Sequence, residues 1–334
     1  MLETNKYVRV ISLDFSKAFD CIKHSELMDK YSKLDMPDCV YNWLVDFFSG
    51  RQHCTKYNEI TSDFCSISAS VIQGSALGPT SFSVTAANLR PIYKQNEIVK
   101  FADDIYLIIP SENIESTAIE MSNIDSWSES NNLKLNRKKS REIIFYSPRS
   151  KFTKTETPYL EGIERVDTLK SLGVIIQSNF SFSRHIDEII NSCASNLFAL
   201  RTLKAKGLNS DLINTVFKAT VLSKLTYASQ FWWGFLNTND KNRLEVFLRK
   251  SERFGFYSGS TTFETLANIA DDRLFNSITD NTQHVLYPLL PPRKENHYHD
   301  LRPRFHNFTL PIKQNSLSEK NFICRMLYKN IHVC

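Results

Sequence analysis

The sequence lacks the cysteine patterns that hold a metal ion or a disulfide framework. Its seven cysteines are scattered over 334 residues, their number is odd, and none forms a C-x-x-C pair. We therefore expect free thiols in a reducing compartment. The chain also lacks an N-terminal signal peptide, and its apolar runs are far shorter than a membrane span. These absences predict an intracellular protein, cytoplasmic or nuclear, with no membrane partner.

Charge is unevenly distributed along the chain, whose net charge is +5. Residues 1–150 contain 17 Lys+Arg and 19 Asp+Glu, a net of −2, whereas residues 151–334 contain 24 and 17, a net of +7. A half with many carboxylates can hold metal ions, and a basic half can hold a polyanion. On charge alone, a basic surface that is merely solvated is an equally good interpretation.

Two adjacent carboxylates, Asp103 and Asp104, stand at the head of the apolar run 105–109. Because aspartate is costly to bury without a counter-charge, a divalent cation is a natural partner for this pair. Asp14 ends another run, 8–15, that is typical of a buried strand. If the two strands are neighbours, the three carboxylates converge and could bridge two metal ions for phosphoryl or nucleotidyl transfer. Taken alone, Asp14 is more simply a helix N-cap.

The hydrophobic pattern predicts mainly strands in the first half and mainly helices later. Short β-branched runs are typical of strands, and apolar residues three or four positions apart are typical of helices. We expect a β-hairpin within 52–72; strands at 8–15, 99–101, 105–109, 142–146 and 168–176, the last bent at Gly173; and helices at 24–34, 39–48, 80–89, 114–130, 186–203, 211–225 and 240–254. The pattern after Gly259 is mixed, and the proline-rich stretch 288–303 is interpreted as a linker.

Four short motifs give the chain a specific resemblance. They are LDFSKAFD at 13–20, QGSALGP at 73–79, FADD at 101–104 and SLGV at 171–174. Their order and rough spacing are those of a reverse transcriptase. The chain resembles the palm and thumb of a non-LTR (LINE-type, jockey-like) retrotransposon enzyme over residues 8–254. A single Asp-Asp pair would be weak evidence, but four ordered motifs are a strong signal.

The resemblance implies a fold and a domain order. The fold class is α+β, with a polymerase palm built from an antiparallel sheet and helices, followed by an α-helical thumb-like region. The expected domains are a palm with partial fingers at 1–180, a thumb-like region at 181–256 and a C-terminal segment of uncertain structure at 257–334. Trp232 and Trp233 lie in the part that resembles the helical region. A role in the hydrophobic core is a better interpretation of these two residues than a role in base stacking.

The resemblance also implies which residues do the chemistry. Asp14, Asp103 and Asp104 resemble the catalytic metal-binding triad, and Phe15 resembles the position whose backbone carbonyl touches the metal. Lys139 resembles the lysine near the leaving pyrophosphate, where a cation or general acid helps. The implied cofactor is a pair of Mg²⁺ ions, with Mn²⁺ as a substitute. Taken alone, Lys139 would be part of a solvated loop.

Substrate contacts follow from the same comparison of motifs. Phe19 resembles the bulky gate beneath the incoming sugar, where a ring would clash with a 2′-hydroxyl and favour dNTP over rNTP. Gln73 and Gly74 resemble the loop that contacts the nucleotide and template. Leu172 and Gly173 resemble the turn that grips the primer end. The implied partners are an RNA template, a DNA primer and a dNTP, and the implied reaction is RNA-directed DNA synthesis. Oligomeric state is not indicated.

The chain departs from the family pattern in ways that suggest rival interpretations. The fingers motifs and endonuclease expected upstream are absent, and 69–72 and 86–89 differ from the usual approaches to their motifs. We expect a 5′-truncated copy or partial gene model with little activity alone. One rival is a non-catalytic nucleic-acid-binding remnant that uses the basic half. Another is a two-metal nuclease, against which the 73–79 loop argues.

Overall fold

The structure is a computed structural model that describes the chain except for residues 73, 148–156, 294–305, 314–315 and 330–334. The chain divides into two compact units, Met1–Asp167 and Thr168–Cys334. This division reflects compactness, whereas the boundaries predicted at 180 and 256 separate the palm, the thumb-like region and the C-terminal segment, and they stay predictions.

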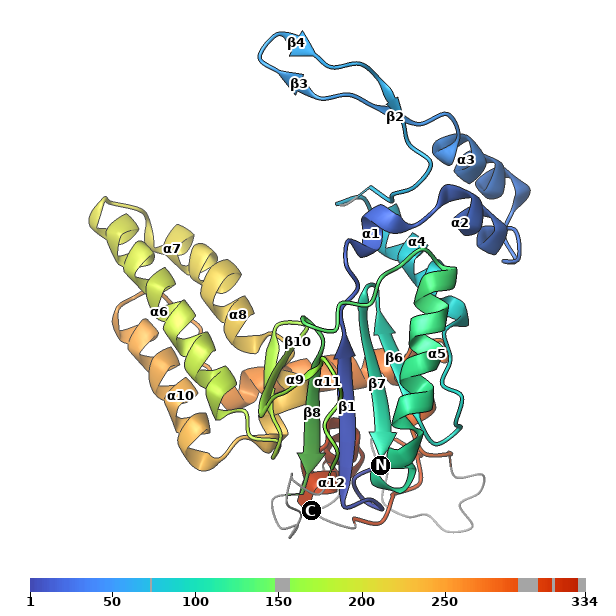
Figure 1. Cartoon of the computed structure of the whole chain (residues 1–334). Helices are drawn as coiled ribbons and strands as arrows, with labels where there is room; N and C mark the ends of the chain where they lie inside the picture. The colour runs from blue at the N-terminus through green and yellow to red at the C-terminus, as the bar shows by residue number, and fades with distance from the viewer. Residues whose placement is uncertain (73, 148–156, 294–305, 314–315, 330–334) are drawn as a thin grey trace. The chain divides into compact units, whose positions relative to one another are not determined.

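A five-stranded sheet in the order β6-β7-β1-β8-β9 organises the described part of the first unit (Figure 1). β1 (Tyr7–Leu13) is central and antiparallel to both β7 (Asp104–Pro110) and β8 (Arg141–Tyr146). β6 (Glu97–Phe101) pairs antiparallel with β7, and the short β9 (Glu164–Arg165) is parallel to β8. The β-branched runs of β1 and β8 suit a sheet with little solvent contact on either face. The predicted α+β class is confirmed.

Helices pack against this sheet through one apolar core. α4 (Leu77–Thr85) contributes Phe82 and α5 (Thr117–Ser130) contributes Ile124 to a buried cluster that includes Ile11 and Leu107 of the sheet. All four side chains are fully buried. The remaining helical segments of this unit are α1 (Ala18–Cys21), α2 (His24–Tyr31), α3 (Asp38–Phe48) and the 3₁₀ turns η1 (Ala86–Asn88) and η2 (Ser111–Ser116).

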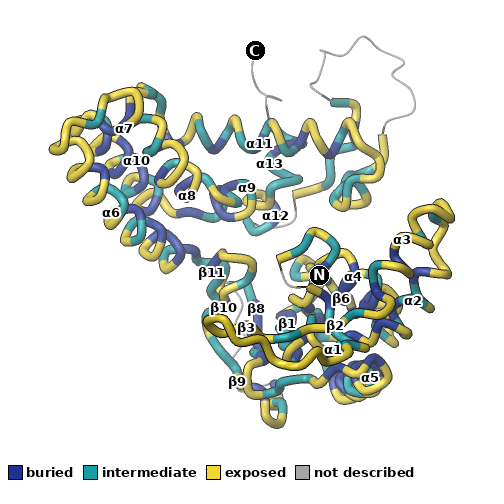
Figure 2. The backbone as a smooth tube through the Cα atoms, turned by 90° about the horizontal axis from the view of Figure 1, so that it is seen from above, coloured by how far each residue is buried: buried dark blue, intermediate teal, exposed yellow. Residues whose placement is uncertain are grey.

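The predicted hairpin within 52–72 is confirmed and is built from two short ladders. β2 (Gln52–His53) pairs with β5 (Cys65–Ser66), and β3 (Lys56–Tyr57) pairs with β4 (Ile60–Thr61). Every residue in these strands is exposed (Figure 2), and Figure 1 shows the β3–β4 end extending away from the sheet. This hairpin therefore contributes little to the core.

The second unit begins with a hairpin, β10 (Thr168–Ser171) and β11 (Val174–Gln177). The predicted single bent strand over 168–176 is therefore wrong. Leu172 (φ 45°) and Gly173 (φ 83°) both adopt the left-handed conformation and close a two-residue turn. Two successive positive φ values give the turn whose twist matches paired strands. The sequence shows the glycine but not the unusual leucine conformation.

Helices form the rest of the second unit. The three predicted helices are confirmed as α6 (Ser183–Ala205), a segment comprising α7 (Ser210–Phe217), the π-helix Lys218–Leu222 and α8 (Ser223–Thr226), and α10 (Thr238–Arg253). α9 (Ser229–Trp232) and η5 (Trp233–Phe235) connect α8 to α10. Trp232 and Trp233 are 0% and 5% exposed, so the core interpretation is confirmed. Burial lowers the pKa of His185 on α6 to about 4.

The segment after Gly259 is more regular than its pattern suggested. α11 (Phe263–Asp280) is a long helix, and η6 (Tyr287–Leu289), α12 (Ser316–Lys320) and α13 (Phe322–Tyr328) follow it. Arg325 of α13 donates to the buried carboxylate of Asp271 on α11 over 2.6 Å. Most of the predicted 288–303 linker, from 294 onward, lies outside the described residues.

Six cysteines of the described chain are free thiols, while Cys334 lies outside the described residues. Across the described residues, no helix combines the length and apolar character needed to cross a membrane.

Candidate active site

The strand register brings the predicted carboxylates together at one end of the sheet. In the β1–β7 ladder Leu13 pairs with Ile105. Continuing this register by one residue places Asp14 opposite Asp104. Phe101 pairs with Asp104 in the β6–β7 ladder, so Ala102 and Asp103 form the two-residue turn between these strands. The two aspartates of the motif therefore lie beside the end of β1.

Asp104 lies in the negative field of Asp103 and Asp14. The pKa of Asp104 is raised above its ordinary value, mainly by partial burial and then by the negative charges of Asp103 and Asp14. Repulsion of this kind favours either protonation of one carboxyl group or binding of a cation. The site therefore has a physical reason to attract positive charge.

The loop 136–140 fixes the backbone at Asp14. The Asp14 N–H donates to Ser140 Oγ over 3.1 Å, and its carbonyl accepts the Asn136 N–H over 2.8 Å. Phe15 forms an isolated antiparallel bridge with Leu135. In such a pair, flanked by the bonds just described, the backbone groups of the bridged residue point away from its partner. The Phe15 carbonyl therefore points away from Leu135.

A pocket of about 370 Å³ opens beside this strand end. Four predicted site residues line it, namely Phe15, Phe19, Gly74 and Asp103. The Phe19 ring packs against Phe82 of α4, with ring centroids 5.6 Å apart. Its carbonyl accepts the Val71 N–H over 2.8 Å, which ties the approach to the 73–79 loop against the α1 segment.

The 73–79 loop is shaped by its glycines. Gly74 has φ +81°, a conformation that residues with a side chain rarely adopt. A Cβ atom at Gly78 would lie 3.0 Å from the Ile72 carbonyl oxygen, so this close approach also favours glycine. Gln73, predicted to contact the nucleotide, lies outside the described residues.

Residues 1–176 of the chain match the family described as reverse transcriptase (RNA-dependent DNA polymerase). The chain belongs to this family. The predicted resemblance to a reverse transcriptase is thereby confirmed, and the FADD turn with its opposing Asp14 lies within the matched region.

Similar proteins come from mobile elements of flies. The RNA-directed DNA polymerases from mobile element jockey of Drosophila melanogaster and Drosophila funebris are 24% and 26% identical over 299 and 302 residues, covering 85% of this chain and 32% of each relative. A probable RNA-directed DNA polymerase from transposon X-element of Drosophila melanogaster is 25% identical over 248 residues, covering 69% of this chain and 26% of its own. These matches support the jockey-like, LINE-type assignment. The chain spans about a quarter to a third of the length of these relatives.

Among solved structures, the apo telomerase from Candida tropicalis superimposes with a TM-score of 0.43 at 12% identity, covering 84% of this chain and 52% of that chain.

The donor atoms of this reverse transcriptase family member fit a hard divalent cation. Among the described residues, no three His, Cys, Asp or Glu side chains already form a group that could hold a metal. A preformed group of three is not required, because Mg²⁺ is commonly held by one or two carboxylates together with substrate phosphates. The raised pKa of Asp104 is consistent with a cation here.

Two lysines differ in how they relate to the pocket. Lys139, predicted to act near the leaving group, is exposed on the 136–140 loop that holds Asp14, and it does not line the pocket. Lys17 does line the pocket, with an unusual φ of 51°. The signal that could have identified it was its place inside the LDFSKAFD motif.

The predicted primer turn belongs to the second unit. Tyr227 of the SKLTYA stretch donates its hydroxyl to the Leu172 carbonyl over 3.0 Å. A Cβ atom at Gly173 would contact Tyr227 Cε1 at 3.4 Å. Tyr227 therefore stabilises the turn through two contacts. The sequence analysis did not predict this interaction.

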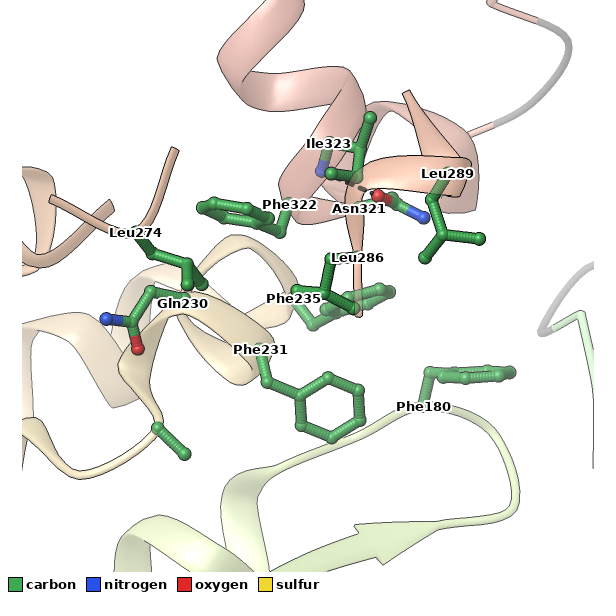
Figure 3. Close-up of a pocket in the computed structure, with 11 residues that line it drawn as sticks. Phe180, Gln230, Phe231, Phe235, Leu274, Leu286, Leu289, Asn321, Phe322 and Ile323 are labelled. Atoms are coloured by element: carbon green, nitrogen blue, oxygen red, sulfur yellow. Dashed lines mark hydrogen bonds between the residues drawn. The ribbon is translucent and has the colours of Figure 1, made fainter. Parts of the chain in front are cut away.

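The second unit also contains an apolar pocket of about 440 Å³ (Figure 3). Phe180, Phe231 and Phe322 contribute to its walls, with Gln230 and Asn321 among its few polar groups. It contains none of the predicted site residues and no charged side chain, so its chemistry does not suit a nucleotide.

Proposed function

We propose that this chain carries out RNA-directed DNA synthesis. A DNA primer 3′-hydroxyl attacks the α-phosphate of a dNTP paired to an RNA template, and pyrophosphate leaves. The observation that supports this most is the register that sets Asp14 opposite Asp104, next to a pocket lined by Phe19 and Gly74. The binding of template, primer and nucleotide is part of this proposal, because the chain spans only part of the length of its relatives.

Asp14, Asp103 and Asp104, with the Phe15 carbonyl, would hold two Mg²⁺ ions, or Mn²⁺ in their place. When bound, these ions would lower the pKa of the attacking hydroxyl and neutralise charge on the phosphate oxygens. The residues themselves must stay ionised to do this. Burial and the negative charges of Asp103 and Asp14 raise the pKa of Asp104, so acid opposes the ionised form of Asp104 that a cation would need.

The pocket residues would select and orient the nucleotide. As the gate beneath the sugar, the Phe19 ring would present carbon instead of a hydrogen-bond partner to a 2′-hydroxyl, which would favour a deoxyribose. The positive φ of Gly74 would let the backbone approach the base pair closely. Lys17 at the pocket wall would supply positive charge for the triphosphate, and Lys139 would serve the departing pyrophosphate.

The second unit would bind the primer and the nucleic-acid backbone. The Leu172–Gly173 turn would hold the primer terminus, and the net positive charge of the second half would hold the nucleic-acid backbone. Free thiols suit the reducing environment of the cytoplasm or nucleus, where RNA and chromosomal DNA are available.

Primer extension by the full chain tests the proposal. The assay uses an RNA template, a labelled DNA primer, dNTPs and Mg²⁺, with Asp103→Asn as the test variant and Asp35→Asn, an exposed aspartate outside the site, as the matched control. We expect weak extension by the parent chain, because its sequence resembles only part of the enzyme, and equal extension by Asp35→Asn. Asp103→Asn should lose a further factor of about 10²–10³, because one ligand of the charge-stabilising site is gone.

The same assay separates the rival functions. Salt-dependent binding without extension would show a non-catalytic nucleic-acid-binding protein, and Mg²⁺-dependent cleavage of the primer or template would show a nuclease. Either result overturns the proposal. Phe19→Ala adds a specificity test: we expect the preference for dNTP over rNTP to fall by up to about 10²-fold, the scale on which an apolar contact rejects an added hydroxyl.

A further inference from the structure

A groove of about 650 Å³ runs between the C-terminal half of α6 and the end of α10 in the second unit. The two helices are in contact and lie side by side in Figure 1. Phe247 and Phe256 form its floor and are 8% and 4% exposed. Phe198 and Phe254 stand at its rim and are 75% and 49% exposed. The groove thus presents two aromatic rings to solvent.

Three cations accompany these rings, namely Arg201, Lys204 and Lys250. Lys204 donates to the Phe254 carbonyl over 2.7 Å, which fixes its charge at the C-terminus of α10. Lys250 Nζ lies 5.9 Å from the centroid of the Phe254 ring. Arg201 makes no hydrogen bond or ion pair with any residue that the structure describes. No acidic side chain lines the groove, so its positive charge is not neutralised locally.

The wider charge distribution favours a polyanion over a neutral partner. The second unit, residues 168–334, has 21 Lys+Arg against 13 Asp+Glu, a net of +8. Along α6, residues 190, 194, 198, 201 and 205 repeat at helical spacing, so one stripe of the helix runs from apolar floor to basic rim. Exposed aromatic rings beside cations are the chemistry of sequence-tolerant single-strand binding, in which bases stack and phosphates meet positive charge.

We propose that this groove binds a single-stranded nucleic-acid segment. One base stacks on Phe198 and a neighbouring base on Phe254, while Arg201 and Lys250 face the phosphates between them. The site is separate from the polymerase pocket in the first unit, and it requires neither metal nor turnover. An acidic peptide would satisfy the cations but would leave the two flat rings without stacking partners, so the rings favour nucleic acid.

Fluorescence anisotropy with a labelled 15-nucleotide oligo(dT) tests this on the full chain in EDTA. Phe198→Ala should raise the Kd by about 5- to 30-fold, since base stacking on the ring is lost. Phe198→Trp should keep parent affinity. The matched control is Leu212→Ala on α7, which removes another apolar side chain that is 53% exposed. Since Phe198 is so exposed, its replacement should leave the thermal unfolding curve unchanged.

Charge gives a second readout. Arg201→Gln should lower the slope of log Kd against log[salt] by about 0.7, the value for one phosphate contact to a single strand. Lys218→Gln removes the same charge from an exposed site outside the groove and should leave the slope unchanged.

The outcomes separate this proposal from its alternatives. Equal affinities of Phe198→Ala and Leu212→Ala for oligo(dT) would overturn it, as would competition by poly-glutamate as strong as by unlabelled oligo(dT), which would indicate an acidic-peptide site. Because Asp103→Asn should bind oligo(dT) like the parent in EDTA, loss of polymerase activity and loss of groove binding are distinguishable.

Discussion

The ion cluster around Glu142 gives the sharpest test of how the first unit is held together. Glu142 of β8 is fully buried between two guanidinium groups: Arg9 Nε lies 2.7 Å from Oε1, and Arg165 Nε lies 2.9 Å from Oε2. Arg9 is 1% exposed and also donates to Thr117 Oγ1 of α5 over 2.8 Å. The cluster therefore links β1, β8 and α5, and β1 is the strand that ends at Asp14.

Glu142→Gln keeps the shape of the side chain and removes its charge. The buried Arg9 guanidinium then loses the carboxylate with which it pairs. Breaking a buried pair in this way costs about 3–5 kcal/mol of the free energy of unfolding. For a unit of this size, each kcal/mol lowers the Tm by about 2–4 °C, so the transition of the first unit should fall by roughly 6–20 °C.

Thermal unfolding followed by circular dichroism measures the shift, and hydrogen exchange in peptides from β1 and β8 assigns it to the first unit. Glu26→Gln is the matched control, because Glu26 pairs with Lys23 at the surface, where such a pair contributes about 0–1 kcal/mol. Replacing Arg9, Glu142 and Arg165 together by Met should recover much of the loss, since the three side chains then pack as apolar groups. A Glu142→Gln shift no larger than that of Glu26→Gln would refute the reasoning.

Three further predictions concern the site. Asp104→Asn should raise the free energy of unfolding at pH 7 in EDTA by at most about 1 kcal/mol, because the raised pKa of Asp104 means that its ionisation opposes folding. The difference between the variant and the parent should vanish at a pH below the pKa of Asp104 in the unfolded chain. A lower Tm of the variant at pH 7 would contradict this prediction. Tyr227→Phe should raise the KM for primer–template several-fold more than it lowers kcat, since the turn loses a hydrogen bond worth about 1 kcal/mol, whereas Tyr57→Phe on the exposed hairpin should change neither. Lys17→Gln should raise the KM for dNTP by about 5- to 10-fold, and an effect equal to that of Lys33→Gln would count against its role.

The local sequence pattern was enough to predict a helix or strand wherever the residues of that segment determine its structure. The β-branched runs that became β1 and β8 and the helical spacing of α6 and α10 were predictable, because burial on a strand or a helix face leaves a direct periodic trace. α11 left a trace as well, since Thr262 caps it by accepting the Thr265 N–H and Phe263, Ala267, Phe275 and Ile278 line its buried side. Its interspersed aspartates obscured that pattern.

Other features depended on contacts between distant parts of the chain. Nothing local indicates that Leu172 adopts a positive φ, a conformation that costs a residue with a side chain about 1 kcal/mol or more and is held here by Tyr227, 55 residues away. Nor does the sequence show that Asn136 and Ser140 clamp Asp14, or that Lys17 lines the pocket while Lys139 does not. In each case a residue distant in sequence but close in space determines the conformation of a side chain or of the backbone.

The sequence alone determined the family and predicted which three carboxylates form the metal site, because motif order can be recognised without any knowledge of packing. Only the tertiary structure decided how they meet. The antiparallel register of β1 on β7 sets Asp14 opposite Asp104, and a slip of one residue would turn every side chain of the strand to the other face. Register is chosen by burial summed over the whole sheet, which no single stretch of sequence contains.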